Sequence, residues 1–207
     1  MAHPRHEVFA GHTVARTTSF DEAHDAVCRV YLPHRLDLWG HDPCLDMRLN
    51  AVQLGNITAG HLRYGRDVRI VTTEAAHCHV DIPLVGATES RSGGKDVVQS
   101  STRCAAVFMP GAPAAIRWHA DCEQLCLMID RDQLERELET MLGRPIPGPV
   151  EFVTTMNLAG NGGRRWLESV ALFKREFEGP PVLSQHPLAA RTLERLLIDG
   201  LLLVQPH

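Results

Sequence analysis

Residues 47–65 read MRLNAVQLGNITAGHLRYG, and this stretch decides the fold class. It holds two runs rich in apolar and β-branched residues, 47–55 and 57–65, each closed by a glycine, which is the pattern of short strands separated by turns. Similar runs follow up to residue 130: DVRIVTT (67–73), HCHVDIPLVG (77–86), DVVQSS (96–101), CAAVFMPG (104–111), AAIRWHA (114–120) and EQLCLMID (123–130). No long helical pattern interrupts them, so about eight consecutive strands predict an antiparallel barrel or sandwich.

A helix precedes these strands. Ser19 and Glu22 form a capping box, in which the serine caps the first turn and the glutamate returns the hydrogen bond. The helix is predicted from about residue 20 to residue 31, because Pro33 disfavours helical backbone at the residue before it. Residues 1–18 are polar and are expected to form a flexible arm.

The last part of the chain follows a helical period. Helices are predicted over 131–142, 162–178 and 187–207, where apolar residues recur with a spacing near 3.6. The expected fold class is therefore α+β, mainly β. Residues 1–130 would form the arm, one helix and the β-domain, and residues 131–207 a subdomain of about three helices.

The final predicted helix carries two apolar strips. One broad arc contains Leu188, Leu193, Leu196, Leu197, Leu201, Leu203 and Val204. Ile198 and Leu202 form a second, narrower strip among the charged residues of the other side. One stripe is enough to pack a helix on its own domain, so the second strip favours contact with another partner. The alternative is a core helix with more apolar residues than it needs.

Composition limits the class of protein. At 44% apolar residues the chain can fill a core, which excludes wholesale disorder. The formal net charge of −4, with 21 basic and 25 acidic residues, argues against a nucleic-acid-binding surface. No export signal or membrane span is recognisable. The six cysteines lack a CxxC pair and are expected to be reduced thiols of a cytoplasmic protein.

The sharpest chemical pattern is the run His77-Cys78-His79-Val80-Asp81. On a strand, His77, His79 and Asp81 share one face. Two histidines at this spacing can chelate a transition metal. The same face could instead meet solvent, or line the barrel interior and supply polar contacts to a bound molecule.

Neighbouring predicted strands add Arg63, Tyr64 and Trp118. An aromatic ring of Tyr64 or Trp118 could stack on a small molecule, and Arg63 could pair with a carboxylate. A tryptophan in a β-domain is, however, usually a core residue. The sequence contains no GxSxG, HExxH or phosphate-binding loop, so it is not expected to be an enzyme.

Four local sequences, taken in order, resemble the N-terminal domain of AraC/XylS-type transcription regulators. They are Tyr31-Leu32-Pro33-His34-Arg35-Leu36; Leu62-Arg63-Tyr64-Gly65; Ile82-Pro83-Leu84-Val85-Gly86 with Met109-Pro110-Gly111; and Leu201-Leu202-Leu203-Val204-Gln205-Pro206-His207. The resemblance covers nearly the whole chain and rests on the order and spacing of these pieces. It implies a cupin-like β-barrel or jelly roll that binds a small-molecule effector, and helices that form a homodimer. It also implies that DNA is bound only through a helix-turn-helix half missing from this chain.

The resemblance gives the singled-out residues expected roles. Candidate effector-binding residues are Arg63, Tyr64, His77, His79, Asp81 and Trp118, and candidate dimerisation residues are Arg191, Arg195, Ile198 and Leu202. No cofactor or metal is expected. The alternative function is a metal-dependent cupin enzyme that uses His77 and His79. Two ligands of the cupin pattern are missing, however, because its carboxylate position falls on Pro83 or Leu84 and alanines follow Pro110-Gly111.

Overall fold

The structure, a computed structural model, describes residues 7–39, 45–73, 77–94 and 96–207. Its elements follow the chain as β1 (Thr13–Thr17), α1 (Phe20–Val30), β2 (His34–Leu38), β3 (Met47–Leu54), β4 (Ile57–Arg63), β5 (Val68–Thr72), β6 (His77–Val85), β7 (Thr88–Ser92), β8 (Val98–Ser100), β9 (Cys104–Phe108), β10 (Ala114–Trp118), β11 (Glu123–Asp130), α2 (Arg131–Leu142), β12 (Thr155–Asn157), α3 (Asn161–Glu178) and α4 (Pro187–Val204).

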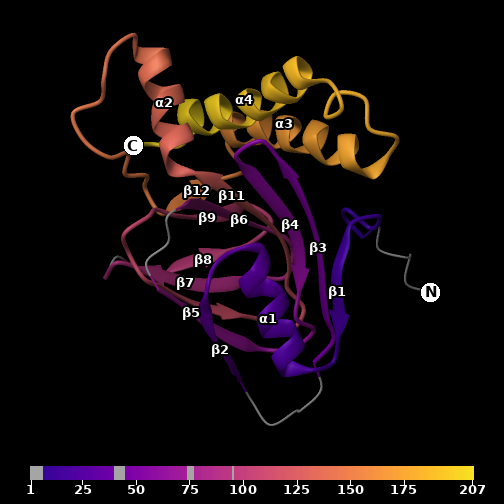
Figure 1. Cartoon of the computed structure of the whole chain (residues 1–207). Coiled ribbons are helices and arrows are strands. Elements are labelled where there is room, and N and C mark those ends of the chain that lie inside the picture. Colours follow the sequence, from indigo (N-terminus) through magenta and orange to yellow (C-terminus); the bar gives the residue numbers. More distant parts are fainter. Residues whose placement is uncertain (1–6, 40–44, 74–76, 95) are drawn as a thin grey trace.

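The strands form two antiparallel sheets. One has seven strands in the order β1-β3-β4-β11-β6-β9-β12, and the other has five in the order β2-β5-β10-β7-β8. The helices α2, α3 and α4 lie together as a layer beside the larger sheet, whereas α1 lies against the strands away from that layer (Figure 1). The predicted fold class, α+β and mainly β with a cupin-like jelly roll, is confirmed.

The larger sheet is buried on both faces, and alternate residues of β6 show this. Cys78, Val80 and Ile82 belong to a hydrophobic core shared with the helical layer. His79 and Asp81 point the other way, towards the barrel interior, and are only 9% and 7% exposed. The idea that these polar residues form a solvent-exposed face is therefore wrong.

The predicted flexible arm is wrong for the part that the structure describes. Residues 13–17 form the edge strand β1, which pairs with β3. Before it, Phe9 is fully buried, with its ring 6.1 Å from that of Phe173 and 6.2 Å from that of Phe177 on α3. Residues 1–6 lie outside the described residues. One buried aromatic residue thus anchors a segment whose composition is otherwise polar.

The predicted helices agree with the structure to within a few residues. Ser19 accepts a hydrogen bond from the backbone N–H of Glu22 at the start of α1, which is the N-cap half of the predicted capping box. The glutamate does not return the bond, because the Ser19 N–H donates to the Thr17 hydroxyl, which itself donates to the Glu22 carboxylate. At α2, Asp130 accepts from the backbone N–H of Gln133, and Gly143 ends the helix with φ of 65°. Among the helices of the described ranges, none is both long and apolar enough to cross a lipid bilayer.

The orientation of α4 differs from the prediction. Ile198 and Leu202, which were expected to face a partner, are 0% and 4% exposed and pack in the core with the sheet and α3. The exposed apolar residues of this helix are instead Leu188, Leu196 and Leu203, at 70%, 43% and 73%. The helix does carry two apolar strips, but the one facing outward comes from the broad arc.

Candidate functional site

A narrow cavity of about 60 Å³ lies in the barrel interior, bounded by α1 and by strands of both sheets. This volume is well below the roughly 150 Å³ of a cavity that binds benzene, so as it stands the cavity can hold only water. Apolar side chains make up much of the wall: Val27 from α1, Leu62 from β4, Ile70 from β5 and Ile116 from β10. The cavity therefore resembles a small-molecule pocket in character, with a mostly apolar wall and few polar groups.

Three aromatic side chains shape the cavity. The rings of Tyr64 and Trp118 meet edge to face, with centroids 5.4 Å apart. The Trp118 indole is fixed because its N–H donates to the Cys122 carbonyl oxygen at 3.0 Å. On the α1 side, the Tyr31 hydroxyl donates to the Cys126 carbonyl oxygen at 3.3 Å. The Tyr31 hydroxyl packs directly over Gly60. A Cβ added at position 60 would collide with this hydroxyl, so a glycine is needed there.

Burial keeps the polar wall of the cavity close to neutral. It raises the pKa of the Asp81 carboxyl from 3.8 to about 7, although a hydrogen bond from the Cys126 thiol opposes this shift. Burial, helped by the neighbouring His77, lowers the pKa of the His79 imidazole from 6.5 to about 4. Burial also lowers the pKa of His34, on the same wall. At neutral pH the two histidines are uncharged and Asp81 is close to half protonated.

Several polar atoms of the cavity wall lack a hydrogen-bond partner in the described part of the chain. They are the Tyr64 hydroxyl, His79 Nε2 and His34 Nε2, and all three are buried. Buried polar atoms in native proteins are nearly always hydrogen-bonded to protein or to ordered water. These atoms can therefore donate to or accept from a molecule held in the cavity.

The structure brings four of the six predicted effector-binding residues to this cavity: Tyr64, His79, Asp81 and Trp118. The other two do not line it. Arg63 projects from the opposite face of β4, with Nη1 3.3 Å from the Asp46 carboxylate, because neighbouring residues of a strand point to opposite faces. His77 stands at the first position of β6, beyond the cavity wall.

Other lining residues escaped the sequence prediction. Tyr31 lies in the link between α1 and β2, His34 is the first residue of β2, and Cys126 lies on β11 directly opposite Asp81 of β6. Strand alternation would have placed Cys126 beside Asp81 had the pairing of β6 with β11 been known. Tyr31 and His34 entered only the predicted end of a helix and the family resemblance, and neither was given a binding role.

The predicted metal-binding alternative is not supported at its histidines. Among the described residues, the group of ligand atoms close enough to share an ion comprises His24, Cys28 and His34, and includes neither His77 nor His79.

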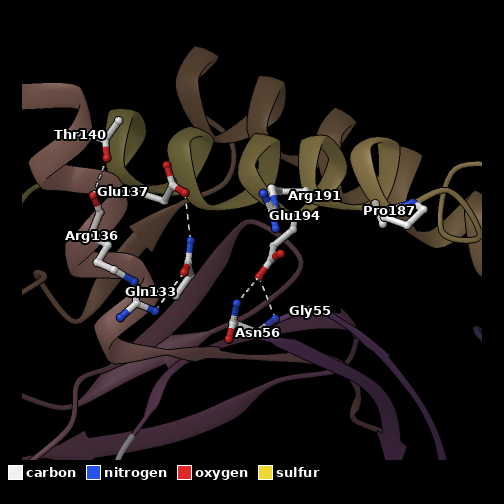
Figure 2. A pocket seen from close by; sticks show the side chains of 10 residues that line it. Gly55, Asn56, Gln133, Arg136, Glu137, Thr140, Pro187, Arg191 and Glu194 are labelled. Atoms are coloured by element: carbon white, nitrogen blue, oxygen red, sulfur yellow. Dashed lines mark hydrogen bonds between the residues drawn. The ribbon is translucent and has the colours of Figure 1, made fainter.

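A second, larger cleft of about 570 Å³ separates α2 and α4 from the turn between β3 and β4 (Figure 2). Glu194 of α4 reaches across it and accepts hydrogen bonds from the backbone N–H and the side-chain amide of Asn56, at 2.7 and 2.8 Å. The neighbouring Gly55 has φ of 56°, and an added Cβ there would collide with the Glu194 carboxylate. Glu194 thus ties α4 to the barrel.

The two arginines of the predicted dimerisation set lie on the exposed side of α4. Arg191 lines the cleft and is exposed. Arg195 Nε lies 3.1 Å from Glu137 of α2 and 3.2 Å from Asp199 one turn along α4. Both ion pairs are within this chain, so Arg195 already has acidic partners.

Comparison with known proteins identifies the family of this chain. Residues 23–203 match the family described as AraC-binding-like domain. A relative in Rhodococcus erythropolis, the probable thc operon regulatory protein, is 32% identical over 191 residues, which make up 90% of this chain and 57% of the relative. The chain thus spans little more than half of that protein.

One solved structure agrees in fold over most of the chain. The AraC-like transcriptional activator CuxR is similar over 93% of this chain and 72% of its own, with a TM-score of 0.67 at 12% identity. Oxalate decarboxylase from Bacillus subtilis shows a weaker likeness, with a TM-score of 0.38 at 10% identity over 55% of this chain and 45% of its own. From the extent of the family match and the agreement in fold, this chain belongs to the AraC-binding-like domain family of transcriptional regulators.

Proposed function

We propose that this chain is the ligand-sensing domain of an AraC-type regulator and that a small-molecule effector binds in the barrel cavity. The observation that carries the proposal is the set of buried polar atoms without a partner, on Tyr64, His79 and His34, around a mostly apolar cavity. In a region that serves only as hydrophobic core, we would expect such polar atoms to be hydrogen-bonded to the protein or replaced by apolar groups. In the whole protein, DNA would be bound by a region outside this chain. A cytoplasmic location also stays a prediction.

The cavity favours an uncharged effector over an anionic one. Among the described residues that line it, none is an arginine or a lysine, and burial holds His79 and His34 neutral. An anionic effector would therefore lose its hydration without gaining a cationic partner. The edge-to-face pair of Tyr64 and Trp118 offers surface to an aromatic or other flat apolar group. We expect such a group with one or two hydroxyl, amide or carbonyl functions.

Binding of such a molecule requires the cavity to expand, since about 60 Å³ does not hold a benzene ring with substituents. Tyr31 closes the α1 side of the cavity with a single hydrogen bond to a carbonyl oxygen. We expect effector entry to displace Tyr31 and α1 outward. The effector would thereby stabilise one of two conformations, which is what a regulatory ligand must do.

The test is the melting temperature of the purified chain with a panel of uncharged benzene derivatives that carry one hydroxyl or amide group, each compared with its carboxylate analogue. A ligand present at about 100 times its Kd raises the free energy of unfolding by about 2.7 kcal/mol. We expect a rise with uncharged probes that is lost in Tyr64→Phe, which removes only the unpartnered hydroxyl. Arg63→Ala is the matched control on the opposite face of β4 and should respond as wild type does. A response lost in Arg63→Ala and kept in Tyr64→Phe would refute this site, as would no response to any uncharged probe.

The signal from the cavity would reach α4 along β4. This strand starts beside Asn56, which Glu194 of α4 holds, and it reaches the cavity at Leu62. A shift of β4 on effector binding would therefore act on α4 at Glu194. In relatives that extend further, the DNA-binding region would follow this helix.

We also propose that the chain forms a homodimer through the exposed strip of α4, defined by Leu188, Leu196 and Leu203. Three leucines exposed by 43% to 73% on one helix face are unusual for a surface with no partner. Ile198 and Leu202 are buried within the chain, so the exposed leucines take their place as the proposed dimerisation residues.

A further inference from the structure

A second cluster of chemically active side chains lies where α1 meets β2. His24 and Cys28 are one turn apart on α1, and four residues of separation places them on the same face of the helix. His34, the first residue of β2, completes the cluster from the other side. The Cys28 Sγ atom lies 3.5 Å from His24 Nε2 and 3.4 Å from His34 Nδ1. An ordinary thiol hydrogen bond needs only one imidazole, whereas here two converge on one sulfur.

These distances match those of a metal site. Tetrahedral Zn²⁺ bound by sulfur at about 2.3 Å and by nitrogen at about 2.0–2.1 Å holds sulfur and nitrogen about 3.5–3.6 Å apart. The two observed separations are 3.5 and 3.4 Å. All three ligand atoms lie within 4.8 Å of one another. The His24 side chain is 33% exposed, so it can rotate to close the remaining gap.

The protons of the cluster can be accounted for. His24 Nε2 now donates to the His34 carbonyl oxygen at 2.7 Å, and His34 Nδ1 donates to the Leu32 carbonyl oxygen at 3.0 Å. A metal ion would need the lone pairs of these nitrogens, so the ring protons move to the other nitrogen of each ring, and the thiol proton is released to solvent. His24 Nδ1 then faces the Asp25 carboxylate, 3.8 Å away, as metal-bound histidines commonly do.

We propose that His24, Cys28 and His34 bind a divalent transition-metal ion of the zinc class. Two imidazoles and one thiolate suit borderline-soft ions such as Zn²⁺ and Co²⁺, and exclude Mg²⁺ and Ca²⁺, which prefer oxygen. Three protein ligands leave a fourth position for water or an added ligand. The ion would tie α1 to β2. Since His34 also lines the barrel cavity, its Nε2 would become a hydrogen-bond donor towards that cavity. The site itself does not depend on effector binding.

The experiment is a titration of the metal-depleted chain with Co²⁺, followed by displacement with Zn²⁺. We expect about one equivalent of Co²⁺ to give visible ligand-field bands and a near-ultraviolet thiolate charge-transfer band, both removed by Zn²⁺. Cys28→Ser should lose the charge-transfer band and bind at least about 10- to 100-fold more weakly, since the loss of an outer-shell partner alone commonly costs that much. Cys104→Ser, another partly buried cysteine, should behave as wild type.

His24→Gln provides a second variant that leaves the thiolate in place on a partly exposed helix face. It should weaken Co²⁺ binding by a similar factor but keep the charge-transfer band at saturation. Far-ultraviolet circular dichroism establishes that each variant is folded, and if Cys28→Ser does not fold, His24→Gln decides alone. A wild-type chain without the charge-transfer band would overturn the proposal. So would a band that persists in folded Cys28→Ser, or Co²⁺ affinity unchanged in His24→Gln.

Discussion

The two tyrosines of this chain occupy one cavity but differ in a single hydrogen bond. The Tyr31 hydroxyl donates to a carbonyl oxygen, whereas the Tyr64 hydroxyl is buried without a partner in the described residues. An intramolecular hydrogen bond contributes about 1 kcal/mol to stability, and an unpaired buried hydroxyl contributes nothing favourable.

Tyr31→Phe is therefore expected to lower the free energy of unfolding by about 1 kcal/mol. Tyr64→Phe should leave it unchanged or raise it slightly. Urea denaturation of both variants without added ligand provides the comparison. Equal losses in the two variants would mean that the Tyr64 hydroxyl has a partner, for example an ordered water, that stabilises the fold.

Asp81 and His79 give opposite pH dependences of stability. The folded-state pKa of Asp81 is raised to about 7, so between about pH 4 and 7 the folded chain holds a proton that the unfolded chain has lost. Its contribution is full below pH 4 and is lost as the pH rises. The folded-state pKa of His79 is lowered to about 4, so its contribution is present above about pH 6.5 and is lost as the pH falls.

We expect these slopes, each at most about 1.4 kcal/mol per pH unit, to offset one another between about pH 4.5 and 6.5. Asp81→Asn should make the unfolding free energy rise with pH more steeply than in wild type. His79→Gln should make the unfolding free energy fall as the pH rises. Chemical denaturation at several pH values measures this, and differences from wild type cancel the titration of all other groups. Three parallel profiles would contradict the assigned shifts.

At the scale of the element, one carboxylate joins α4 to the turn between β3 and β4, in addition to the apolar residues by which the helix packs on the sheet. Glu194 is only 8% exposed and accepts two hydrogen bonds from Asn56, including one from its backbone N–H. Glu194→Ala would leave these donors unpaired and is expected to cost about 1–3 kcal/mol of unfolding free energy.

Arg191→Ala is the matched control for Glu194→Ala. It removes an exposed charge from the same helix and cleft and should change stability by less than about 0.5 kcal/mol. Thermal unfolding compares the two variants. A loss of similar size in both would show that the cleft as a whole, and not the grip on Asn56, stabilises α4.

The elements that the sequence predicts well are those with a strong local signal. The N-cap signal at Ser19 and the leucine spacing of α2 place both helices closely. The strands β2, β7 and β12 were missed because they are short and polar: β7, for example, reads TESRS. They exist because neighbouring strands offer them a hydrogen-bonded edge, which no local pattern reveals.

The wrong orientation of α4 and the missed part of the cavity also have physical causes. A helical wheel identifies apolar strips but not which of them meets the core, and the 5.4 Å contact of Tyr64 with Trp118 joins residues 54 positions apart. Arg63 was misplaced beside Tyr64 because strand alternation had not been applied to that pair. Four of the thirteen lining residues could thus be predicted, namely those with chemically distinctive side chains on or beside the predicted strands.

For the whole molecule, the proposed dimer gives a direct test of which strip of α4 faces outward. Leu196→Glu combined with Leu203→Glu should convert a dimer into a folded monomer, because both residues are exposed in the single chain. Ile198→Asp should instead unfold the chain, since burying an unpaired carboxylate costs several kcal/mol. Sedimentation velocity with circular dichroism separates these outcomes. A wild-type monomer at tens of micromolar would rule out this interface.

The larger sheet, buried on both faces, also has a genetic consequence. Along β6, side chains turn alternately to the barrel interior and to the helical layer. In a mutational scan scored with a reporter, substitutions at positions 79 and 81 should change the response to the proposed effector. Those at 78, 80 and 82 should chiefly lower the amount of protein in the cell. The two phenotypes would alternate residue by residue, so a scan of a single strand would separate sensing from folding.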